Sequence, residues 1–128
     1  MYESLTIIGR LGGDPELRYT PAGQAVANFS VAVNARWISK DGDAEERVTW
    51  YRIACWGRLA EVTNQYLSKG RMVMVTAKRI VAEPYIGKDG KPRAALKVTA
   101  DAVKFLDNAN PDPRTEVDND EEPGEMPF

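Results

Sequence analysis

Aromatic rings and positive side chains are interleaved along the middle of this chain, and both can contact unpaired nucleotides. Trp50 and Trp56 are six residues apart, so in an extended strand they share a face with Arg52. Trp37 and Tyr85 each flank a polar segment, and Trp37 is the strongest candidate because it lies among basic residues. Bases stack on such rings with about 1–3 kcal/mol each, while a groove of cations holds the phosphates. We predict that these four aromatic residues stack on an unpaired strand.

Basic residues surround these rings in the sequence. Arginine suits both tasks because its planar head also stacks. The lysines could equally be solvated surface charges. Arg47 and Arg79 are interleaved in the same way but lie outside the predicted set. The pattern predicts phosphate contacts for Arg36, Lys40, Arg52, Arg58, Lys78, Lys88, Lys91 and Arg93.

A structural role is the alternative for each ring, because an aromatic residue within a strand is most often part of the core. Arg52 argues against that role for the face it shares with Trp50 and Trp56, since an arginine there indicates contact with water. The opposite face, predicted as core, carries Tyr51, Ile53 and Cys55.

The composition weighs against an enzyme. The 128 residues, enough for one domain, include no histidine, the commonest general base and metal ligand. The single Cys55 can form neither an internal disulfide nor a cysteine-rich zinc site. Carboxylate or lysine chemistry stays open, but we predict no catalytic residue, metal or cofactor. The lone cysteine fits a reducing compartment. The sequence also shows no secretory pattern and no apolar run of about 18–20 residues that could cross a bilayer, so we predict a cytoplasmic location.

Charge is unevenly distributed along the chain. The formal net charge is −2, but residues 107–128 carry −7 and residues 1–106 carry +5. A basic body with an acidic tail suggests two kinds of partner. The alternative is that the tail only aids solubility.

Residues 1–106 are predicted to form one mostly β domain. In residues 25–37, Ala27, Phe29 and Val31 alternate with Asn28 and Ser30, which is typical of a strand with one buried face. The predicted strands are 4–11, 25–37, 47–56, 71–83 and 93–106, with a helix over 57–67 and loops over 39–46 and 84–92. This order predicts an all-β fold with one short helix, a five-stranded Greek-key barrel of the OB type with the helix at one end.

Residues 107–128 are predicted to be a disordered acidic tail. Pro, Asp, Glu and Asn dominate this segment, and the sizeable apolar residues are Val117, Met126 and Phe128. Such a composition buries too little surface to offset the entropy lost on ordering.

The segments IIGRLGGDPELRYTPAGQAVANFSVAV, VTWYRIACWGRLAEVTNQYLSKG and YIGKDGKPR resemble those of the bacterial-type single-stranded DNA-binding proteins. The resemblance implies a homotetramer of OB domains with DNA wrapped over the outside. It also implies stacking by Trp37, Trp50, Trp56 and Tyr85. The cationic positions carried over from the family are Arg18, Arg52, Arg58 and Lys69.

The C-terminal tip, Met126–Pro127–Phe128, matches the same family. There the tip binds helicases, polymerase subunits, primase and repair proteins, which implies that residues 123–128 recruit such partners. The ring of Phe128 would enter an apolar pocket while its carboxylate meets a basic residue, and Pro127 lowers the ordering cost. This tail is shorter than that of many members, and Pro123–Gly124 interrupts its acidic run.

The leading hypothesis is sequence-tolerant binding of single-stranded DNA at the nucleoid during replication, recombination and repair. An OB domain devoted to RNA or to protein assembly is the runner-up, because the fold serves many ligands. A nuclease is least favoured, because the main acidic cluster lies in the tail and lacks fixed geometry.

Overall fold

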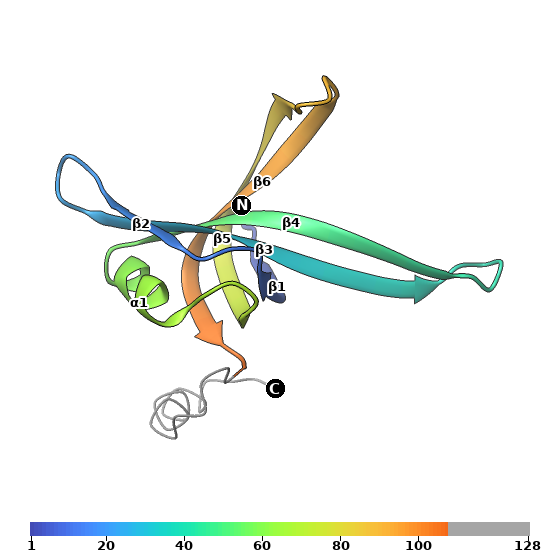
Figure 1. The fold of residues 1–128 in the computed structure, drawn as a ribbon, viewed down its shortest axis with the longest axis horizontal. Coiled ribbons are helices and arrows are strands. Elements are labelled where there is room, and N and C mark those ends of the chain that lie inside the picture. The colour runs from blue at the N-terminus through green and yellow to red at the C-terminus, as the bar shows by residue number, and fades with distance from the viewer. Residues whose placement is uncertain (108–128) are drawn as a thin grey trace.

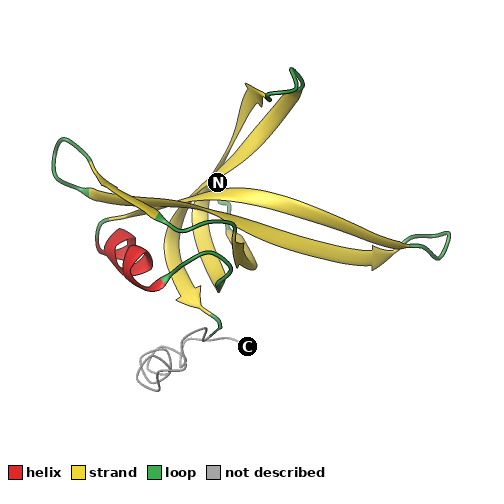
Figure 2. Ribbon diagram, in the orientation of Figure 1, coloured by secondary structure: helices red, strands yellow, loops and turns green. Residues whose placement is uncertain are grey.

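The computed structural model describes residues 1–107, and these residues form one layer of strands rolled into a barrel, with one helix beside it (Figures 1 and 2). Every predicted strand and the predicted helix are confirmed. The elements are β1 (Leu5–Leu11), β2 (Glu16–Tyr19), β3 (Ala25–Ile38), β4 (Ala44–Trp56), α1 (Arg58–Tyr66), β5 (Met72–Ile86) and β6 (Pro92–Phe105).

Five of the strands close the barrel, in the order β1-β5-β6-β4-β3 and back to β1. The closing contact is short and pairs Arg10 with Ala32 and Leu11 with Val31. A side chain at Gly9 would collide with the carbonyl oxygen of Ala32, so glycine lets the two strands approach there. The predicted OB-type barrel is therefore confirmed.

One strand was not predicted from the sequence. Residues Glu16–Tyr19 form β2, an edge strand that pairs with β3 from Glu16↔Asn28 to Tyr19↔Ala25. The four residues ELRY carry a single apolar position facing the core, Leu17, so their alternation is too short to reveal a strand.

The core is formed by alternate residues of the strands, as the period of two requires. Ala27, Phe29 and Val31 of β3 are buried, as are Ile53 and Cys55 of β4. Val73 and Val75 of β5 and Val98 of β6 complete the interior, and Ala60 and Leu67 join it from α1 and the residue after it.

Two hairpins, β3–β4 and β5–β6, extend as arms beyond the barrel (Figure 1). The strands run further than predicted, because β4 begins at Ala44 rather than 47 and β5 continues through Pro84 to Ile86. Ala35 shares the face of Phe29 but is exposed, because β3 has left the barrel by that point. The arms therefore offer both faces to a ligand.

The end of β6 is fastened to the barrel by Asp107, the last residue described. The carboxylate of Asp107 accepts hydrogen bonds from Arg71 Nε at 3.0 Å and from Arg10 Nη1 at 3.1 Å. Arg71 is 8% exposed and also donates to the carbonyl oxygens of Tyr66 and Asp107. The predictions for residues 108–128, including disorder and the tip at Met126–Phe128, lie outside the described residues.

Candidate nucleic-acid interface

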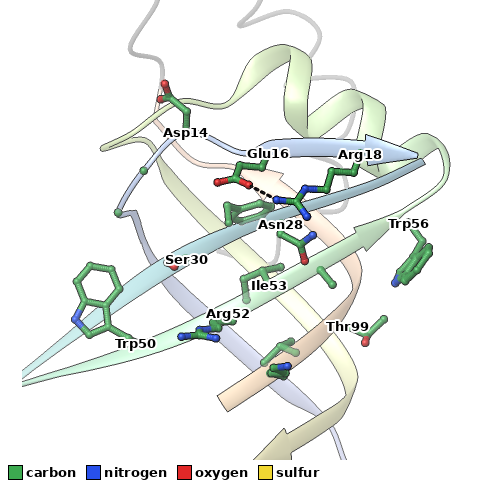
Figure 3. Close-up of a pocket in the computed structure, with 16 residues that line it drawn as sticks. Asp14, Glu16, Arg18, Asn28, Ser30, Trp50, Arg52, Ile53, Trp56 and Thr99 are labelled. Carbon is green, nitrogen blue, oxygen red and sulfur yellow. Dashed lines mark hydrogen bonds and ion pairs between the residues drawn. The ribbon is translucent and has the colours of Figure 1, made fainter. Parts of the chain in front are cut away.

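A cavity of about 770 Å³ lies on the outer face of the barrel, over β3, β4 and β6 and beside the start of β2 (Figure 3). Trp50 and Trp56 stand at its two ends, with Arg52 between them. Asn28, Ser30 and Thr99 add polar groups to the lining. A lining that combines apolar rings with a few polar groups can take flat molecules that also carry hydrogen-bonding edges.

The predicted facing of β4 is confirmed. Trp50 is 54% exposed and Trp56 is 42% exposed, whereas on the opposite face Ile53 and Cys55 are buried and Tyr51 is partly buried against the core. The two rings are therefore free to contact a ligand from outside the barrel.

The other predicted rings lie on the arms, and an arginine approaches each of them. Trp37 on the β3–β4 arm is 43% exposed, and the guanidinium carbon of Arg47 is 5.5 Å from its ring centroid. Tyr85 on the β5–β6 arm is 42% exposed, and Arg52 of the barrel is 5.8 Å from its centroid. Both distances lie within the range of a cation–π contact. Arg52 thus connects the cavity to the β5–β6 arm.

Two of the predicted cations, Arg18 and Arg52, line the cavity. Arg36 and Lys40 lie on the β3–β4 arm, and Lys88, Lys91 and Arg93 lie at the tip of the β5–β6 arm. Arg58 begins α1, and Lys69 follows it and donates its backbone N–H to Asp14 of the cavity rim. Lys78 is set apart, beside a separate hollow that Met1, Tyr2 and Glu3 also line. The structure therefore gathers Arg18 and Arg52 with the rings of β4, places other cations on the two arms and beside α1, and leaves Lys78 apart.

Several of these cations already have a carboxylate partner. Arg18 lies 3.3 Å from Glu16, Arg36 lies 3.7 Å from Glu46, and Arg93 lies 2.7 Å from Asp89. Hydrogen bonds from the backbone of Lys91 and from Arg93 lower the pKa of Asp89. All three arginines are more than half exposed, so a phosphate can compete for them at little cost.

Two cations near the rings were missing from the predicted set. Lys97 of β6 lines the cavity, because the parallel pairing of β6 with β4 puts it opposite Arg52. Arg47 reaches Trp37 because the β3–β4 register pairs Ala35 with Arg47 and Trp37 with Glu45. The sequence did indicate that Lys97 faces outward, because it alternates with apolar residues. It did not indicate which strand pairs with β6, and so it did not place Lys97 beside Arg52.

Other chemistry finds little support in residues 1–107. This part of the chain holds no group of three or more His, Cys, Asp or Glu residues placed to bind a metal ion. Burial raises the pKa of the Cys55 thiol to about 12, outweighing a hydrogen bond from Thr63 that lowers it. Cys55 is therefore neutral and shielded from solvent, which does not suit a nucleophile. Within the described residues no helix has the length and apolar character to cross a bilayer.

The model of the single-strand binding protein family matches residues 2–106. A single-stranded DNA-binding protein of Neisseria meningitidis serogroup B is 45% identical over 104 residues, which cover 81% of this chain and 59% of that protein. One of Wolinella succinogenes, with the same name, is 36% identical over 108 residues, 84% of this chain and 66% of that protein. This chain thus spans about 59% of the length of the Neisseria relative.

Solved structures agree on the fold. The structure of a Plasmodium falciparum SSB in complex with ssDNA superposes with a TM-score of 0.71 at 24% identity and covers 84% of this chain and 97% of that one. A small single-stranded DNA-binding protein from Streptomyces coelicolor gives 0.69 at 18% identity and covers 82% and 94%. At these identities the likeness concerns the fold alone. With the matched family model and the relatives of higher identity, it follows that this chain belongs to the single-strand binding protein family.

Proposed function

We propose that this protein binds single-stranded DNA without reading its sequence and so shields unpaired strands. The observation that carries the proposal is the outer face of β4, where Trp50, Arg52 and Trp56 stand exposed over one cavity. Rings and a guanidinium side by side match the two parts of a nucleotide, because the base stacks and the phosphate pairs with the charge. The names of the relatives support the same ligand.

The arms extend the proposed path beyond the cavity. Trp37 and Tyr85 offer further rings, each already beside an arginine. Every base has a flat face, so stacking tolerates any sequence. We place the predicted contacts of the basic residues on the two arms along this path, where they would neutralise phosphates.

Titration with oligo-dT tests the proposal. We expect quenching of tryptophan fluorescence and a log–log salt slope of about −0.7 for each phosphate contacted. A duplex of equal length serves as the control and should bind more weakly. Absence of both quenching and salt dependence would overturn the proposal. Competition with an RNA strand of equal length separates DNA binding from an RNA-directed function.

We further infer that the protein is not an enzyme. The relatives are named for DNA binding, and the described residues hold no metal cluster that a nuclease could use. A labelled oligonucleotide should stay intact after long incubation with the protein and Mg²⁺. Cleavage that a chelator stops would refute this inference.

Recruitment of replication, recombination and repair proteins through residues 123–128 is a second part of the proposal. Its support is the sequence of the tip, an apolar Met126–Pro127–Phe128 after an acidic run. Deletion of Met126–Phe128 should abolish capture of such partners and leave oligo-dT affinity unchanged. The substitution Val117→Ala, which removes an apolar side chain outside the tip, is the control. Equal capture by the deletion and the intact chain would refute the role of the tip.

Assembly into a homotetramer at the nucleoid, in the cytoplasm, completes the proposal. Large apolar side chains that are exposed in the single chain, such as Ile8, Ile38 and Ile86, support association. Light scattering with and without a long oligo-dT gives the number of subunits and the stoichiometry together. A monomer at micromolar concentration would contradict it.

A further inference from the structure

Gly12 lies against the Cζ3–Cη2 edge of the Trp50 ring. A Cβ atom placed on Gly12 would be 2.6 Å from Cζ3 and 2.9 Å from Cη2 of Trp50. Real Cβ atoms essentially never come that close to another heavy atom, so the indole occupies space that any other residue would need. Gly12 is the first residue after β1, and both Gly12 and Trp50 line the cavity.

The sheet explains how these two residues meet. Trp50 of β4 pairs with Ala32 of β3, and Ala32 pairs in turn with Arg10 of β1. The indole therefore extends from β4 across the small Ala32 toward the end of β1. The N–H of Gly12 donates to the carbonyl oxygen of Ser30 at 2.9 Å, which fixes the glycine against β3. Ala32 of β3 and Gly12 after β1 thus form a small-residue surface, here called the shelf, against which the large Trp50 ring lies.

Other reasons for a glycine at this position are missing. The φ angle of Gly12 lies outside the left-handed region, so an alanine could adopt the same backbone. Gly12 is exposed, so no packed core excludes a methyl group. The nearby atoms that a methyl group would strike all belong to the far end of the Trp50 side chain. The missing side chain therefore serves the position of that ring.

We propose that Gly12 is a positioning residue for Trp50: it lets the indole rest on the barrel with its exposed part turned to the cavity, ready to stack on a base. The inference rests on the proposed binding of single-stranded DNA and deepens it. A ring held in place before binding loses less conformational entropy when the base arrives. A ring pushed off the shelf would have to be ordered at that moment.

The test compares Gly12→Ala with Gly13→Ala in the full chain. A Cβ atom at Gly13 meets nothing within 4 Å, and its φ is also outside the left-handed region. Gly13→Ala therefore measures what one added methyl group at the cavity rim does by itself. Both variants should keep the melting temperature of the original protein. Gly12→Ala should weaken oligo-dT binding by about 2- to 12-fold, the ordering cost of one large side chain, and Gly13→Ala should weaken it less.

A double-mutant cycle with Trp50→Ala supplies the decisive readout. Trp50→Ala alone should weaken binding by about 5- to 150-fold, the range for one stacked base. In that background Gly12→Ala should have no further effect, because the ring that it displaces is gone. With Trp37 and Trp56 replaced by Phe, the remaining Trp50 should show lower fluorescence anisotropy without DNA in Gly12→Ala and not in Gly13→Ala.

The outcomes separate the two proposals. If the original chain fails to bind oligo-dT, the proposed function is wrong. If the original chain binds and Gly12→Ala binds equally well, or weakens binding to the same extent in the Trp50→Ala background, the positioning role is refuted. A lower melting temperature for Gly12→Ala alone would assign the glycine a structural role instead and would also overturn the inference.

Discussion

Glu16 forms an ion pair with Arg18, one of the cations of the cavity, and so competes with a phosphate for it. Replacing Glu16 should therefore tighten DNA binding. Its carboxylate lies 3.3 Å from Arg18, and both residues line the cavity (Figure 3). The pair is exposed, with 73% of the Arg18 side chain and 70% of the Glu16 side chain accessible. Glu16→Gln removes the charge and keeps the shape. Because such an exposed pair contributes at most about 1 kcal/mol, the free energy of unfolding should change little.

The size of the effect follows from counterion release. Each phosphate neutralised on a single strand adds about 0.7 to the log–log salt slope. Over the tenfold span from about 1 M to about 0.1 M salt, this slope amounts to a factor of roughly five in the binding constant. One full additional contact at about 0.1 M salt therefore corresponds to roughly fivefold tighter binding. The exposed Arg18 can already contact a phosphate while Glu16 lies 3.3 Å away, so this figure is an upper limit. We expect a gain of about two- to fivefold and a slope steeper by up to about 0.7.

The assay is an oligo-dT titration at several salt concentrations. The control is Glu61→Gln, which changes the net charge equally from an exposed position on α1. Arg18→Gln should weaken binding, and adding Glu16→Gln to it should restore little, because the cation to be released is absent. If Glu16→Gln and Glu61→Gln gave the same affinity and slope, only net charge would matter and the proposed use of the cavity would be refuted.

The other predictions concern a ring, a thiol and an ion pair. Tyr85→Ala should weaken oligo-dT binding by about 5- to 150-fold and Tyr85→Phe should not, since stacking uses the ring face; equal losses in a titration would argue for the hydroxyl instead. Because burial raises the pKa of Cys55 to about 12, a thiol reagent at pH 8 should label the folded protein no faster than it unfolds, and immediate stoichiometric labelling would contradict this. Burial raises the pKa of Asp107, but hydrogen bonds from the backbone of Met72 and from Arg71 outweigh it and leave the pKa below 3.8. A carboxylate whose pKa is lower in the folded protein than in the unfolded chain stabilises the fold at pH values above its unfolded pKa. Urea titrations should therefore show that Asp107→Asn lowers the free energy of unfolding at pH 7. The difference between variant and original protein should shrink as the pH falls below about 4. A constant difference would exclude the charged pair as its cause.

The sequence alone determined which side of β4 faces the core. Ile53 and Cys55 are buried and Trp50 and Trp56 exposed, as the period of two predicts. That alternation is a local property, because successive side chains of a strand point to opposite faces whatever the rest of the chain does. The long strands were predictable for the same reason, and the helix from the helical spacing of its apolar residues. The four-residue β2 was not, since so short an edge strand carries almost no pattern.

Only the tertiary structure decided which residues meet across strands. Lys97 lies beside Arg52 because β6 pairs in parallel with β4, and Gly12 meets the edge of the Trp50 ring because β1 closes the barrel against β3. Partners and registers of strands far apart in the chain depend on how the whole sheet twists and closes. No short stretch of sequence contains that information, so the rings and Arg52 could be predicted from the sequence, but the contact of Gly12 with Trp50 and the places of Lys97 and Arg47 beside the rings could not.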